Sequence, residues 1–148
     1  MNARDARTAA TPAKGVLPTG AGQALWRGFR GHCPACGEGR MFRAFLKVAD
    51  KCPNCGEELH HHRADDFPAY LVIVIVGHIL VPILLAVETE IAPAVWISMT
   101  VWPLAALTMA LGLLQPVKGA VVAIQWFGGM HGFEEAKKAR ILAAAAKG

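Results

Sequence analysis

Residues 69–87 read AYLVIVIVGHILVPILLAV, an apolar run without a single Asp, Glu, Lys or Arg. At ~1.5 Å per residue, a helix of this length spans roughly 28 Å, close to the ~30 Å hydrocarbon core of a bilayer. A second charge-free run covers residues 91–114. The sequence therefore predicts a transmembrane helical hairpin over 65–116, with spans at about 68–87 and 91–114.

The distribution of charge predicts how this hairpin is oriented. Lys and Arg lie on the outer side of both apolar runs, whereas the connector has only Glu88 and Glu90 as charged residues. Because basic residues accumulate on the cytoplasmic side of membrane proteins, both termini of this multi-pass chain are predicted to be cytoplasmic. Residues 1–24 show no apolar signal-peptide stretch, and we predict that they form a disordered lead.

All four cysteines lie in two short motifs, CPACG at 33–37 and CPNCG at 52–56. Two C-x2-C pairs at this spacing are typical of zinc ribbons, because two tight turns can together present four thiolates in a tetrahedron. Alternating residues between the motifs indicate a short β-hairpin. We therefore predict a zinc ribbon over 25–64 in which Cys33, Cys36, Cys52 and Cys55 hold one structural zinc ion per chain.

Other interpretations of this N-terminal part are open but less favoured. Disulfides are disfavoured by a cytoplasmic location, and a one-iron centre is disfavoured by the short spacing and the basic surroundings. The stretch LWRGFRG before Cys33 mixes basic and aromatic residues in a way that also suits nucleic acid. The small net charge of residues 1–68 makes contact with anionic lipid the simpler explanation.

A polar segment joins the predicted ribbon to the first span. It contains His60, His61, His62, Asp65 and Asp66. One interpretation is an additional transition-metal or proton site between ribbon and membrane. The favoured interpretation is a polar hinge in which an Asp caps the first helix just before Pro68, which is tolerated in a first turn.

His78 is the ionisable residue at the middle of the first span. Ionisable groups inside a membrane are usually functional, which makes His78 a candidate metal ligand, cofactor ligand or proton relay. Because no acidic residue shares its depth, we favour a neutral imidazole that is hydrogen-bonded across the hairpin or to a partner subunit. Small residues, among them Gly77 and Gly112, are expected to let the two helices approach closely.

Residues 117–128 follow Pro116 and are apolar but too short to cross a bilayer. Lys118 and Gln125 lie on one narrow polar stripe, which predicts an amphipathic helix in the cytoplasmic interface or against the hairpin. An Ala-rich tail completes the unit 117–148. The predicted fold class is a mainly α membrane protein with a small N-terminal zinc ribbon, a transmembrane hairpin and a C-terminal interfacial helix.

Several motifs resemble the bacterial family known as domain of unknown function 983. They are CPxCG followed by Gly39–Phe42, FLKVAD at 45–50, the second CPxCG, HHRADDFPAY at 61–70, GH at 77–78, GLLQPVKG at 112–119 and MHGF at 130–133. The resemblance covers about residues 25–133 and implies a zinc-ribbon protein of the bacterial inner (cytoplasmic) membrane without an established activity. Members are sometimes encoded near cytochrome oxidase subunits and assembly factors, which implies a respiratory-assembly role.

The sequence favours a non-enzymatic function. It shows no Ser/His/Asp arrangement, no phosphate-binding loop and no open zinc site. The leading hypothesis is a membrane-anchored adaptor or assembly factor that binds a protein partner in the membrane, with a homodimer as a further option. The alternative is copper or haem handling through His60–His62, His78 and His131, of which His78 and His131 fall inside motifs of the family, as do Asp65 and Asp66.

Overall fold

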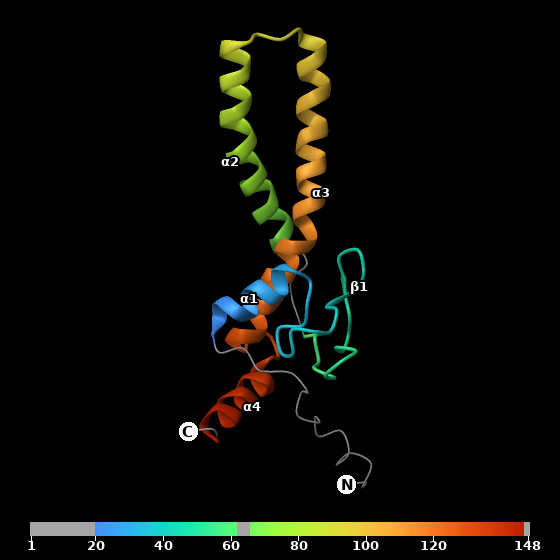
Figure 1. Ribbon diagram of the computed structural model, residues 1–148, viewed down its shortest axis with the longest axis vertical. Coiled ribbons are helices and arrows are strands. Elements are labelled where there is room, and N and C mark those ends of the chain that lie inside the picture. The colour runs from blue at the N-terminus through green and yellow to red at the C-terminus, as the bar shows by residue number, and fades with distance from the viewer. Residues whose placement is uncertain (1–19, 62–65, 147–148) are drawn as a thin grey trace.

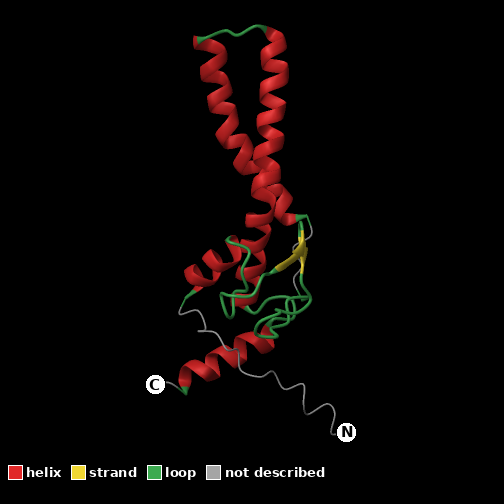
Figure 2. Cartoon of the chain, turned by 45° about the vertical axis from the view of Figure 1, so that its right-hand side comes forward, coloured by secondary structure: helices red, strands yellow, loops and turns green. Residues whose placement is uncertain are grey.

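The computed structural model describes residues 20–61 and 66–146 and shows a mainly helical, elongated molecule (Figure 1). Its elements, in chain order, are α1 (Ala21–Phe29), β1 (Phe42–Ala44), β2 (Lys47–Val48), α2 (Phe67–Glu90), α3 (Val95–Gly128) and α4 (Glu134–Ala145). The two long helices form a hairpin at one end, and the ribbon, α1 and α4 lie at the other (Figure 2). The predicted fold class is thereby confirmed.

The hairpin consists of α2 and α3, both long and apolar enough to cross a membrane. Pro68 lies in the first turn of α2, as predicted, because a first-turn proline has no helical hydrogen bond to lose. Asp66 occupies the capping position, but within the described residues its side chain makes no capping hydrogen bond. Asp65, the other candidate cap, lies outside the described residues.

The two helices pack closely only near the ribbon. There a small apolar core forms around Val72 and Val76 of α2 and Val117 of α3. Toward the connector the helices diverge (Figures 1 and 2). At that end Glu88 of α2 accepts hydrogen bonds from Ser98 Oγ at 2.6 Å and Trp102 Nε1 at 3.1 Å, both from α3. A half-buried carboxylate therefore links the helices where apolar packing is sparse.

The close approach expected at Gly77 and Gly112 is wrong. A methyl group built on either residue would meet no atom of the described chain within 4 Å. The tight glycine contact lies instead between Gly28 of α1 and Gly119 of α3, where a Cβ on either residue would overlap the backbone of the other. The closest backbone approach is therefore between the ribbon unit and the hairpin, whereas the two spans contact each other through the side chains of their small apolar core.

The expected break after the second span is also absent, since α3 continues through Pro116 to Gly128. Residues 117–128 do not form a separate interfacial helix. Val121, Val122 and Trp126 are buried in the ribbon core, and this burial outweighs the one helical hydrogen bond that Pro116 removes. The helix ends where Gly129 adopts a left-handed conformation and its N–H bonds the carbonyls of Gln125 and Trp126.

The N-terminal boundary is corrected as well. Residues 21–24, which we expected in a disordered lead, belong to α1, and Ala24 is fully buried against the ribbon core. Residues 1–19 lie outside the described residues. Figure 1 shows α1 crossing α3 just below the hairpin. The last residues of the expected lead are helical because Ala24 and Gly28 present a small-residue face that fits against α3.

Candidate metal centre

The two cysteine motifs form equivalent turns. In the first, Gly37 N–H donates to the carbonyl of Cys33 at 2.8 Å; in the second, Gly56 N–H donates to that of Cys52 at 3.0 Å. Both glycines have positive φ, +76° and +75°, which L side chains rarely adopt. Gly39 N–H donates to Cys36 Sγ at 3.4 Å. The glycine after each second cysteine therefore allows the turn, as the sequence predicts.

The short hairpin between the motifs brings the two turns face to face. β1 and β2 pair antiparallel, with Phe42 opposite Val48 and Ala44 opposite Lys47. Gly39 matters here, because a Cβ at this position would overlap Cys52 Sγ. The loop can therefore pass directly over one thiol, and the second turn closes onto the first.

The four thiols converge in a geometry that fits one tetrahedral metal ion. Their Sγ atoms all lie within 4.8 Å of one another. Cys33 to Cys55 and Cys36 to Cys52 are both 3.8 Å apart. A tetrahedron with metal–sulfur bonds of ~2.3 Å has sulfur–sulfur edges of about 3.8 Å, whereas a disulfide needs about 2.05 Å. The arrangement suits a tetrathiolate site and leaves no fifth donor position.

Electrostatics within the cluster favour a thiolate at one position. The Cys33 thiol donates to Cys55, which lowers the pKa of Cys55 to about 5 and raises the pKa of Cys33. Burial raises the pKa of the Cys52 thiol. Metal binding therefore has to displace protons from buried thiols, which is the usual coupling between metal binding and thiol ionisation in such sites.

The site is tied to the flanking helices by two long-range contacts. Arg27 of α1 donates through Nη1 to the carbonyls of Pro34 and Ala35 in the first turn, at 3.2 and 3.1 Å. Trp126 of α3 donates through Nε1 to Glu57 Oε1, just after the second turn, at 2.9 Å. Burial raises the pKa of Glu57, and the bond from Trp126 offsets part of that rise. Sequence reasoning missed Glu57, because its partner is 69 residues away.

Two candidate histidines of the polar segment, His60 and His61, lie beside the turn that follows α3. His61 packs edge-on against Phe133, with ring centroids 5.7 Å apart, in the turn that follows α3. His60 stacks beside it and is exposed. Asp66 instead begins α2, at the level where the spans meet. His62 lies outside the described residues. His61 and Asp66 are therefore held by different elements, and the residues that join them are not described.

His131 lies in the same turn as Phe133 and is exposed, with a positive φ of 54°. A methyl group on the neighbouring Gly132 would meet His61 Nδ1. The turn that holds His131 thus lies against His61. Glu58, which sequence reasoning did not single out, completes this region because its Oε2 is 3.4 Å from His61 Nε2.

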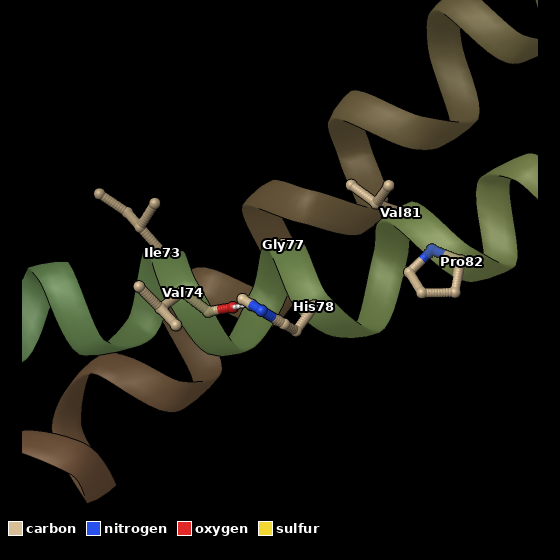
Figure 3. A pocket seen from close by; sticks show the side chains of 6 residues that line it. All are labelled: Ile73, Val74, Gly77, His78, Val81 and Pro82. Carbon is tan, nitrogen blue, oxygen red and sulfur yellow. Dashed lines mark hydrogen bonds between the residues drawn. The ribbon is translucent and has the colours of Figure 1, made fainter.

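His78 lies apart from all of these residues, on the outer face of α2. It lines a shallow groove of about 430 Å³ with Gly77 and Pro82, among others (Figure 3). Its Nδ1–H donates to the carbonyl of Val74 at 2.8 Å. The hydrogen bond expected across the hairpin is therefore formed within α2 itself.

A model of the family described as Protein of unknown function (DUF983) matches residues 42–126, more than half of the chain. The chain belongs to this family. The DUF983 match includes the second cysteine turn and both long helices, while Cys33, Cys36 and His131 lie outside the matched residues. The resemblance drawn from the sequence motifs is thereby confirmed. No curated protein and no solved structure showed a significant match.

Proposed function

We infer that this DUF983 protein is a non-enzymatic membrane adaptor that presents a zinc ribbon at a fixed position beneath the bilayer. The observation that supports this most directly is the continuity of α3. Val95–Gly128 is one helix, whose first part belongs to the hairpin and whose last part is buried in the ribbon core. A ribbon held in this way cannot rotate freely against the membrane, which suits a rigid docking platform.

The donor set supports zinc as the ion in the ribbon. Four thiolates in a tetrahedron are the usual ligands of structural zinc, and they leave no open position for a substrate or a water. Iron can occupy the same geometry and is the alternative. Elemental analysis of the purified protein distinguishes the two ions: zinc gives a colourless protein with one zinc per chain, whereas iron gives a coloured one.

The position of α1 supports the lipid surface as one partner. Gly119, which α1 crosses, lies five residues beyond Leu114, roughly 8 Å along the helix. The headgroup layer outside the ~30 Å core is about 5–8 Å thick. At this level α1 exposes Trp26 and Phe29, which stack on each other, and Arg30 lies over the Trp26 ring. Exposed aromatic groups at headgroup depth favour contact with lipid, and the basic residues on this side favour both termini in the cytoplasm. The bacterial inner membrane is the location that the family resemblance implies.

The adaptor role is tested by co-purification of the tagged full chain from native membranes in mild detergent. We expect a membrane-protein partner, and the family resemblance makes respiratory complexes the first class to examine. The matched comparison is Cys33→Ser, which removes a ligand of the ribbon, against Lys138→Ala on the exposed face of α4. The partner should be lost in the first variant and kept in the second. Recovery of this chain alone from all three samples would contradict the role.

A second candidate function, metal handling, has one specific observation in its favour. That observation is the clustering of Glu58, His60 and His61 outside the ribbon site. His78, on which this candidate also depended together with His131, donates its Nδ1–H to the carbonyl of Val74, and its Nε2 is the nitrogen left to bind a metal. The observation in favour of this candidate therefore lies at the ribbon surface, where three donor side chains come together.

A further inference from the structure

Three donor side chains converge just after the second cysteine turn. Glu58, His60 and His61 each present one donor atom, and these atoms lie within 4.8 Å of one another. His61 Nε2 is 3.4 Å from Glu58 Oε2, and the two imidazole centroids are 3.9 Å apart. Neighbouring ligands of one ion with bonds of ~2.1 Å lie about 3–3.4 Å apart. The spacing of Glu58 and His61 is therefore that of ligands that share an ion, and the His60 donor lies within 4.8 Å of both.

The carboxylate is oriented by a lysine. Lys51 Nζ donates to Glu58 Oε1 at 3.1 Å, which leaves Oε2 as the oxygen that faces His61. The same ammonium lowers the pKa of Glu58, so the carboxyl is ionised. Between the donors, Leu59 is fully buried, and its N–H donates to the carbonyl of Asp50 at 2.9 Å. The backbone that carries Glu58 and His60 is therefore fixed by the ribbon itself.

The imidazole of His61 is oriented by a different element. Phe133, which is buried, meets its ring edge-on at 81°. Gly132 lies so close that a Cβ there would be 2.9 Å from His61 Nδ1. The Gly132 contact is on the Nδ1 side, and Nε2 faces Glu58. Orientation of ligands by neighbouring groups is what distinguishes a preorganised site from a chance surface cluster.

We propose that Glu58, His60 and His61 form a second metal site, for a divalent first-row transition ion. Two imidazoles and one carboxylate are ligands that zinc, iron, cobalt and copper all accept, and water would fill the remaining positions. The site differs in kind from the tetrathiolate, because Glu58 and His60 are exposed and coordination is incomplete. It would hold an exchangeable ion. The inference does not depend on the adaptor role, which co-purification tests separately.

The experiment uses the full-length protein in detergent with zinc already bound at the cysteines. Co²⁺ is added as the probe, and binding is followed by calorimetry and visible absorption. We expect one equivalent of Co²⁺ to bind, with the weak d–d bands of nitrogen and oxygen ligands. Glu58→Gln and His61→Gln should each weaken binding at least about tenfold, and the double variant His60→Gln/His61→Gln should abolish it.

The matched control is His32→Gln, which alters a half-buried histidine of the ribbon outside the cluster. It should bind Co²⁺ like the wild type, and zinc content should remain one per chain in every variant. Three results would overturn the proposal. The first is that no Co²⁺ binds beyond the zinc site. The second is that only cobalt–thiolate bands are seen, which would mean that Co²⁺ had displaced the zinc. The third is that His32→Gln and His61→Gln weaken Co²⁺ binding equally.

Discussion

Gly119→Ala should detach α1 from α3 and weaken the ribbon, whereas Gly112→Ala, about two turns earlier in the same helix, should not. At Gly119 the new Cβ would overlap the backbone carbonyl of Gly28, which cannot move aside as a flexible side chain could. At Gly112 the new methyl would meet no atom of the described chain within 4 Å. The two substitutions are chemically identical and differ only in what surrounds them.

The magnitude follows from that difference. Replacing Gly by Ala inside a helix stabilises it by up to about 1 kcal/mol, and both variants gain this amount. Overpacking a tight contact costs about 1–3 kcal/mol, which applies only at Gly119. The ribbon of Gly119→Ala should therefore be about 1–3 kcal/mol less stable than that of Gly112→Ala. For a unit of this size each kcal/mol lowers the unfolding midpoint by about 4–8 °C.

The assay is thermal release of the ribbon metal to a chromogenic chelator, with hydrogen exchange of the α1 amides as a second measurement. We expect a lower release midpoint and faster α1 exchange in Gly119→Ala alone. Equal midpoints in the two variants would refute the reasoning, since they would show that the Gly28–Gly119 crossing does not hold the ribbon in place. Gly28→Ala should behave like Gly119→Ala, because its Cβ would overlap the other side of the same contact.

Three further predictions concern other contacts. Glu57→Ala removes the acceptor for Trp126 Nε1 and should destabilise the ribbon by about 1–3 kcal/mol, whereas Glu57→Gln keeps an acceptor oxygen and should stay close to wild type in the same metal-release assay. Cys33→Ser should abolish stoichiometric metal binding and make the ribbon protease-sensitive while the hairpin stays inserted, as membrane fractionation would show. Trp102→Phe removes one hydrogen bond to Glu88 and should lower hairpin stability by about 0.6–1.7 kcal/mol in detergent-induced unfolding.

The parts of the fold that the sequence predicts are those encoded by local patterns. A charge-free run long enough for a bilayer identifies α2 and the first two thirds of α3 wherever the rest of the chain lies. Likewise each CPxCG motif fixes its own turn, since the glycine that follows supplies the positive φ. Convergence of the two turns needs only the short hairpin between them.

The parts that escaped prediction depend on contacts between distant segments. Pro116 ends a helix on local rules, but burial of Val121 and Trp126 in the ribbon carries α3 past it. Gly28 and Gly119 are unremarkable in sequence, and only the crossing of α1 and α3 makes both necessary. The same holds for the histidine cluster: among the described residues its carboxylate is Glu58, which the sequence did not single out, because Phe133 and Gly132 fix where His61 lies.

The ribbon and the membrane helix depend on each other for stability. A ribbon of about forty residues buries too little apolar surface to fold without additional support. Here the support comes from two sources, the metal at the four thiols and the buried face of α3. Because both stabilise the same small core, loss of the metal should loosen the α1–α3 crossing, and loss of the crossing should weaken metal binding by the same free energy. A partner that binds the ribbon would then sense both the metal content and the integrity of the hairpin.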